Sequence, residues 1–143
     1  MITKYKNFQP GPYDNPYNYT TGIMNAYTFG VSPAEQEVIF ALVKSINTID
    51  AIEIGTYTGA SAEAIISALQ PTGKLFCIDW FLGDPIYGVN TIEQGSSAIT
   101  FLRDRIKNIG HDKKLVTIIS DSNEIDYVFK TGFFDFLFLD YYS

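Results

Sequence analysis

The stretch Ala51-Ile-Glu-Ile-Gly-Thr-Tyr-Thr-Gly-Ala-Ser61 decides the fold, because a short apolar run passes through a glycine turn into a helix. Its first four residues predict a strand, and the small and apolar residues 60–69 predict the helix. Gly55 and Gly59 let the backbone approach a ligand closely. Tyr57 stands between them, so the turn differs from the G-x-G-x-x-G dinucleotide fingerprint, and it lacks the Lys-Ser/Thr of a phosphate-binding loop.

The same alternation of apolar runs and helical stretches continues to the end of the chain. Alternating strands and helices are typical of an α/β fold, here a Rossmann-like, doubly wound parallel sheet of four strands. The last apolar run is apolar enough for burial on both faces of the sheet. Besides 51–54, we expect strands at 75–78, 115–119 and 134–140, and besides 60–69 we expect helices at 32–47, 96–108 and 123–130.

The first of these helices has a strong start signal. Ser32 is a candidate N-cap, Pro33 takes the first helical position, and Glu35 is placed to complete a capping box. Apolar residues then recur at helical spacing and predict one buried stripe, namely Val38, Ile39, Leu42, Val43 and Ile46.

The chain divides into two parts. Residues 1–30 are rich in Pro, Asn and Tyr, which disfavours helix and central strand, so we expect an aromatic arm lying on the body. Residues 31–143 hold the alternating pattern and form the predicted domain.

Composition excludes several classes of function. The net charge of −6 disfavours a nucleic-acid binder or a basic membrane-surface protein. No apolar run reaches the roughly 20 residues of a membrane helix, and no signal peptide is evident. The single cysteine, Cys77, is typical of a reducing compartment. We therefore expect a cytoplasmic protein without nucleic-acid or membrane partners.

Ligand-type residues follow every predicted strand. Glu53 lies beside the glycine turn and favours a cationic or donor-rich ligand over a pyrophosphate. Asp79 follows it by 26 residues, near the offset at which an acid accepts hydrogen bonds from ribose hydroxyls. A solvated strand-end acid is the alternative reading. Trp80 could cover an adenine face or simply pack.

Asp121 and Ser122 follow the third strand. An acceptor and a hydroxyl at this place could bind an adenine amino group, and both residue types also suit the N-cap of the helix that follows. Asp140 ends the fourth strand. Because parallel strands end at one edge of a sheet, these residues are expected to gather there.

The quoted stretch resembles motif I of class I S-adenosylmethionine (SAM)-dependent methyltransferases, in particular the O-methyltransferase branch that includes catechol, caffeoyl-CoA and sugar methyltransferases. The run Phe-Asp-Phe-Leu-Phe-Leu-Asp140 is similar to that family's fourth strand. The resemblance covers residues 31–140 and implies methyl transfer from SAM to an oxygen of a small molecule or sugar.

The resemblance also implies roles for single residues. Glu53 would anchor the amino group of SAM, and Asp79 would hold the ribose. Asp140 would stand close to the methyl group and, in metal-dependent members, would be the first metal ligand. The residues that would shape the methionine side are Gly55, Tyr57, Gly59 and Ser61, and those at the adenine are Trp80, Asp121 and Ser122.

Two departures from the family pattern matter. Tyr141 and Tyr142 stand where relatives place further metal ligands, and one carboxylate cannot complete octahedral magnesium coordination. The family's later strands are also absent, which would leave the fourth strand as an apolar sheet edge. We interpret the chain as the first part of a longer protein. Pairing of that edge with a second copy, or cover by the arm, are the alternatives.

Three functions remain open from the sequence. The first is SAM-dependent O-methylation of a small-molecule acceptor, with no general base assigned. The second is a truncated, non-catalytic domain that binds the cofactor or acts by association. The third, a nicotinamide-dependent oxidoreductase, is weakened by Tyr57 in the glycine turn.

Overall fold

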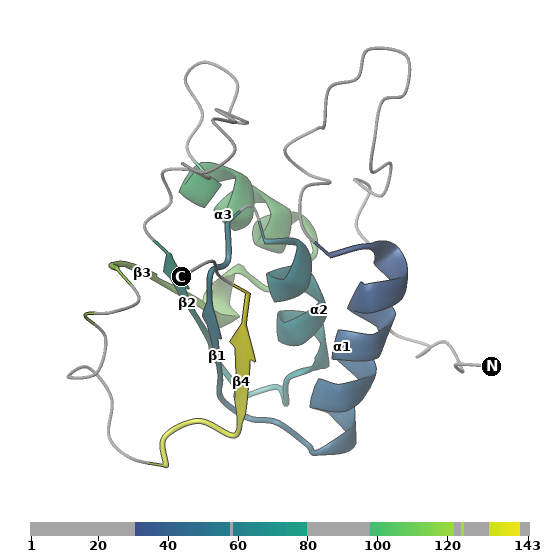
Figure 1. The fold of residues 1–143 in the computed structure, drawn as a ribbon. Coiled ribbons are helices and arrows are strands. Elements are labelled where there is room, and N and C mark those ends of the chain that lie inside the picture. Colours follow the sequence, from purple (N-terminus) through teal and green to yellow (C-terminus); the bar gives the residue numbers. More distant parts are fainter. Residues whose placement is uncertain (1–30, 58, 80–97, 122–123, 125–131, 141–143) are drawn as a thin grey trace, which may run out of the picture.

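A computed structural model describes residues 31–57, 59–79, 98–121, 124 and 132–140 of the chain. The described residues form three α-helices, one short 3-10 helix and four strands (Figure 1). In chain order these are α1 (Pro33–Ser45), β1 (Ala51–Ile54), α2 (Ala60–Ala68), β2 (Leu75–Asp79), α3 (Ala98–Asn108), η1 (Asp112–Lys114), β3 (Leu115–Ile119) and β4 (Phe136–Leu139).

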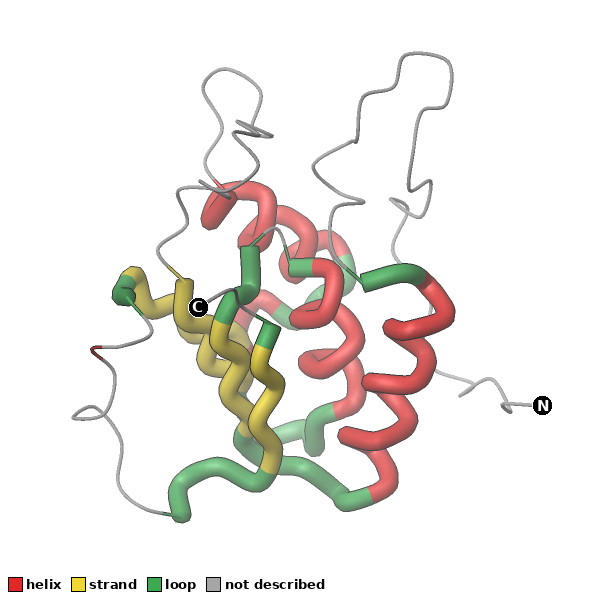
Figure 2. The backbone as a smooth tube through the Cα atoms, viewed as in Figure 1, coloured by secondary structure: helices red, strands yellow, loops and turns green. Residues whose placement is uncertain are grey.

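The strands form one parallel sheet in the order β3-β2-β1-β4 (Figure 2). The chain therefore steps outward from β1 to β3 and returns on the other side of β1 with β4. This reversal of strand order is the place at which open α/β sheets bind their ligands. The register sets Glu53 of β1 between Cys77 of β2 and Phe138 of β4. The predicted α/β fold is confirmed.

All three α-helices contribute to one apolar cluster with one face of the sheet. Figure 1 shows α2 between α1 and α3. Val43 of α1, Ile65 of α2 and Leu102 of α3 are fully buried in this cluster, together with Leu75 and Cys77 of β2. This helix-covered face holds most of the core.

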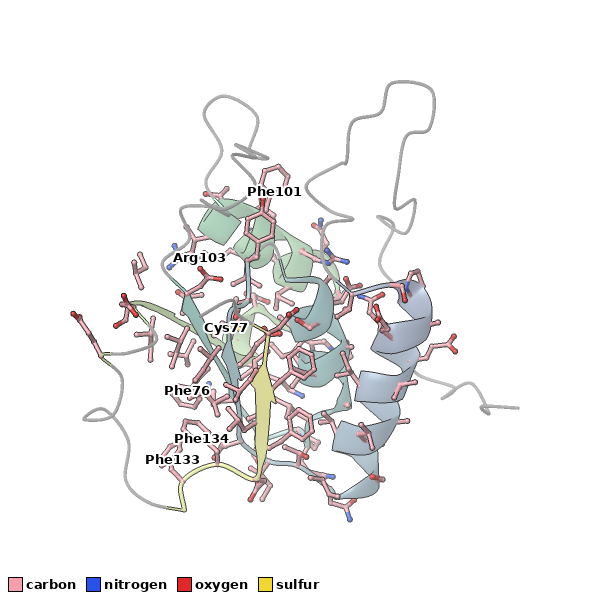
Figure 3. All side chains as sticks on the ribbon, in the orientation of Figure 1. Phe76, Cys77, Phe101, Arg103, Phe133 and Phe134 are labelled. Atoms are coloured by element: carbon pink, nitrogen blue, oxygen red, sulfur yellow. The ribbon has the colours of Figure 1, made fainter. Side chains whose placement is uncertain are left out.

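The opposite face of the sheet carries a smaller cluster around Ile52 and Ile78. Phe76, Phe133 and Phe134 pack edge to face on this side, with ring centroids 4.9–5.7 Å apart (Figure 3).

Strand β4 shows the difference between the two faces. Phe136 and Phe138 pack against the helix-covered cluster, whereas Leu137 and Leu139 are 54% and 55% exposed. The expected burial of this strand on both faces is therefore wrong for the described residues. Side chains alternate between the faces of a strand, and the described helices cover only one of them.

Helix α1 begins as predicted. The Ser32 side chain accepts a hydrogen bond from the Glu35 backbone N–H, and the Glu35 carboxylate accepts one from the Ser32 N–H, which completes the capping box. The predicted apolar stripe is only half right, because Ile39 and Val43 are buried while three of its members are exposed. The exposed members are Val38, Leu42 and Ile46, and the buried face is Gln36, Ile39, Phe40 and Val43.

The predicted elements agree with the structure to within about two residues, except that β4 is shorter than expected and η1 was not predicted. The predicted arm 1–30 and helix 123–130 lie outside the described residues, apart from residue 124. Among the described residues, no helix is long and apolar enough to cross a membrane.

Candidate functional site

The glycine turn between β1 and α2 has left-handed backbone at three positions. Gly55, Tyr57 and Gly59 have φ values of 87°, 52° and 93°. The turn is fastened to β2, because the Gly55 N–H donates to the carbonyl oxygen of Ile78 at 2.9 Å. A side chain at position 59 would be strained, and its Cβ would lie 2.5 Å from Leu102 Cδ1. Glycine is therefore required where α3 packs on the turn.

Glu53 lies under this turn and is fully buried. The Ser61 hydroxyl of α2 donates a hydrogen bond to Oε1, and the Cys77 Sγ lies 3.8 Å from Oε2. Burial raises the pKa of Glu53 from 4.5 to about 7, against the lowering effect of the Ser61 and Thr56 hydroxyls. The same burial raises the pKa of the Cys77 thiol.

Asp79 closes β2 and faces the turn. Its Oδ2 accepts a hydrogen bond of 2.7 Å from the Tyr57 backbone N–H, so one carboxylate oxygen is committed to the turn. The Asp79 carbonyl oxygen accepts a hydrogen bond of 3.1 Å from the Ser120 N–H, which aligns the ends of β2 and β3. The Tyr57 ring packs against the helix-covered core cluster.

Asp140 follows β4 at the same edge. Its backbone N–H donates to the Ile54 carbonyl oxygen at 3.0 Å, which places it beside the end of β1. Partial burial, with the negative charge of Glu35 as a second cause, raises the pKa of Asp140. The charges of Asp140 and Asp79 both raise the pKa of Glu53, so the three carboxylates share one electrostatic environment.

The structure thus brings together most of the predicted site residues at the switch point. Asp121 lies one strand further out, directly after Ser120, and it is exposed. Its carbonyl oxygen accepts a hydrogen bond from the Glu124 N–H at 3.0 Å. Trp80 and Ser122 lie outside the described residues.

The described residues around Asp140 do not support the predicted metal site. Within the part of the chain that the structure describes, no group of three or more His, Cys, Asp or Glu side chains could hold a metal ion. Asp140 alone does not provide the six oxygen ligands that magnesium prefers.

Sequence reasoning missed several polar residues around the turn. Thr56 is 3% exposed, and Gln36 and Glu63 are almost completely buried. Arg105 of α3 is also buried and forms an ion pair with Glu63. One signal could have found Gln36, which falls three and four residues before the buried Ile39 and Phe40.

Comparison with known proteins decides the family. The O-methyltransferase family model matches residues 18–142, which is most of the chain. The chain belongs to the O-methyltransferase family. No curated protein is similar enough to match.

Solved methyltransferase structures share the fold. The O-methyltransferase TomG from Streptomyces achromogenes, solved in complex with SAM, is 20% identical with a TM-score of 0.62, over 80% of this chain and 46% of that one. An O-methyltransferase from Bacillus cereus, solved with S-adenosylhomocysteine (SAH), is 19% identical with a TM-score of 0.59. The match covers 78% of this chain and 46% of that one. The chain therefore spans less than half the length of these structures.

Proposed function

We propose that this chain provides the SAM-binding part of an O-methyltransferase. The observation that carries the proposal is the group of Glu53, Asp79 and Asp140 at the switch point, beside a turn of left-handed backbone. SAM carries a sulfonium and an ammonium group, so an edge with three carboxylates complements its charge. Family membership and the fold shared with SAM-bound TomG support the choice of this cofactor over a nicotinamide dinucleotide.

Each end of the cofactor has candidate residues. Asp79, whose Oδ2 accepts a hydrogen bond from the Tyr57 N–H, is assigned to the ribose hydroxyls, because a carboxylate acceptor suits a ribose without a 2′-phosphate. Glu53 and Ser61 stand at the amino-acid end. Asp121, with Trp80 and Ser122, is assigned to the adenine. Gly55 has no side chain and has left-handed backbone, so that the backbone of the turn can lie against the cofactor there.

The reaction is an SN2 displacement at the methyl carbon. A bond forms between the acceptor oxygen and the methyl carbon, and the bond from that carbon to sulfur breaks, so that the sulfonium becomes a neutral thioether. The proton of the acceptor hydroxyl passes to solvent water. The protein accelerates such a step mainly by aligning oxygen, carbon and sulfur. Asp140 is placed closest to the methyl group in this assignment, and no general base is assigned.

The acceptor is proposed to be a small molecule or sugar hydroxyl, since the family is one of O-methyltransferases. A cytoplasmic location belongs to the same proposal. It is supported by Cys77, which is buried as a free thiol.

Calorimetric titration tests the proposal. SAM and its demethylated product, SAH, are each titrated into the chain, followed by a methyl-transfer assay on a panel of phenol, catechol and sugar acceptors. NAD serves as the control ligand. Binding of SAM and SAH without binding of NAD is the expected result, and binding of NAD alone would overturn the assignment.

Association is a second candidate function, favoured by the exposed Leu137 and Leu139 on β4, the last strand of the described sheet. A second copy that pairs with this strand would satisfy its outer backbone groups, and one that packs on the open face of the sheet would cover both leucines. Binding of SAM without turnover, together with a dimer mass in light scattering, would favour this function. A monomer that transfers methyl groups would exclude it.

A further inference from the structure

Helix α2 begins at the glycine turn, and buried polar side chains from two other helices hold its first turn. Gln36 of α1 is 1% exposed, and its Nε2 donates a hydrogen bond of 2.7 Å to the Ala60 carbonyl oxygen. On the side of α3, the guanidinium of Arg105 forms an ion pair with the carboxylate of Glu63. Figure 1 shows α2 lying between these two helices.

These contacts flank the residue that reaches the candidate site. Ala60 and Glu63 lie immediately before and two residues after Ser61, whose hydroxyl donates to Glu53. A displacement of the first turn of α2 would therefore move Ser61 away from Glu53.

The ion pair is poorly explained by stability alone. Arg105 and Glu63 have side-chain exposures of 3% and 0%, so both charges have lost their water. Apolar side chains of similar volume often stabilise a protein at least as well as a buried ion pair. The pair does fix relative position, because its two charges must stay in contact to offset their desolvation.

A third contact shows how closely α3 approaches the turn. Leu102 lies one helical turn before Arg105, and a Cβ added to Gly59 would meet its Cδ1 at 2.5 Å. Leu102 and Arg105 thus present one face of α3 to the start of α2.

We propose that Gln36 and Arg105 are positioning residues, which act through Ala60 and Glu63 to hold Ser61 in place for the amino-acid end of the cofactor. This inference rests on the proposed function. Neither side chain needs to touch the cofactor, and the nucleoside end, assigned to Asp79 on β2, does not depend on them.

The two ends of the cofactor can be separated by choice of ligand. SAH contains the nucleoside and the amino acid, whereas 5′-methylthioadenosine keeps the nucleoside and the thioether but lacks the amino acid. Both are titrated into the whole chain, and competition against SAH gives the affinity for 5′-methylthioadenosine where direct titration is too weak.

Gln36→Met removes the hydrogen bond to Ala60 and keeps a side chain of similar volume. Arg105→Lys keeps the positive charge but removes the Nε through which the guanidinium contacts Glu63. Val43→Ala is the matched control, because Val43 lies two turns after Gln36 on the same face of α1 and is fully buried. Urea unfolding gives the stability of each variant, and binding is measured where each is folded.

We expect Gln36→Met and Arg105→Lys to weaken SAH binding about tenfold, which corresponds to ~1.4 kcal/mol. Their affinity for 5′-methylthioadenosine should change less than about twofold. For Val43→Ala, the affinities for SAH and for 5′-methylthioadenosine should both change less than about twofold. A merely structural role would leave both affinities unchanged or lower both alike.

The outcomes separate the two proposals. If the unchanged chain binds neither ligand, the proposed function fails and the inference fails with it. If it binds SAH and the variants bind both ligands unchanged, or lose both equally, the inference alone is overturned. If Gln36→Met does not fold, Arg105→Lys, which keeps the positive charge, decides the question by the same criteria.

Discussion

The two faces of the sheet differ in what they bury. The helix-covered face combines a dense apolar cluster with buried polar groups that have partners, such as Glu53 with Ser61 and Gln36 with the Ala60 carbonyl oxygen. The described residues of the opposite face are apolar and aromatic, and there Leu137 and Leu139 are exposed. The candidate site therefore belongs to the face on which polar groups are buried and constrained, since their desolvation is offset only by specific contacts.

The largest expected effect comes from the same substitution on each face. Leu75→Ala removes a fully buried side chain from the helix-covered cluster, and Leu137→Ala truncates one that is 54% exposed. We expect Leu75→Ala to lower the free energy of unfolding by about 3 kcal/mol more than Leu137→Ala does, because only the first leaves a cavity. Urea unfolding measures both. Equal losses would show that the opposite face is as well packed as the helix-covered one.

The second prediction uses the raised pKa of Glu53, which is about 7 in the folded chain against an ordinary 4.5. Between these pH values the folded chain keeps a proton that the unfolded chain has lost. The free energy of unfolding therefore falls as pH rises through this window, by up to about 3 kcal/mol. In Glu53→Gln the free energy of unfolding should lack this part of its decrease with pH, so this variant should be more stable than the unchanged chain at pH 8.

Unfolding of both proteins in urea at pH 5 and pH 8 checks this prediction. Glu124→Gln is the control, because Glu124 is exposed. Its free energy of unfolding should fall between pH 5 and pH 8 as much as that of the unchanged chain. A Glu53→Gln variant with that same decrease would contradict the burial of an ionisable group at this position.

The third prediction compares two glycines with similar backbone. Gly59 and Gly110 have φ values of 93° and 80°, but a Cβ at Gly59 would meet Leu102 while a Cβ at Gly110 would have nothing within 4 Å. Both alanine variants carry backbone strain, and only Gly59→Ala adds overpacking. We expect Gly59→Ala to lower the free energy of unfolding, measured in urea, by about 2 kcal/mol more than Gly110→Ala does. Equal destabilisation would mean that the Leu102 side chain gives way to the added methyl group without a packing penalty.

Much of the fold follows from local sequence signals. The capping box at Ser32, the strand before Gly55 and the glycine turn each have local causes, so the sequence predicts them. The gathering of Glu53, Asp79 and Asp140 also follows, because parallel strands end at one edge.

Other features depend on contacts between distant elements. Gln36 and Arg105 are polar and would normally face solvent, and only the approach of α1 and α3 to α2 explains their burial. The exposure of Leu137 was equally unpredictable, because the hydrophobicity of a strand does not reveal which of its faces is covered.

One measurement tests the central claim, that the carboxyl ends of β1 and β2 bind an adenosyl cofactor. SAH is titrated by calorimetry into the unchanged chain, into Asp79→Ala and into Asp112→Ala, which alters an exposed carboxylate of η1. We expect one binding site, at least about tenfold weaker in Asp79→Ala because the ribose loses its charged acceptor, and unchanged in Asp112→Ala. Equal affinity of Asp79→Ala and the unchanged chain would contradict it.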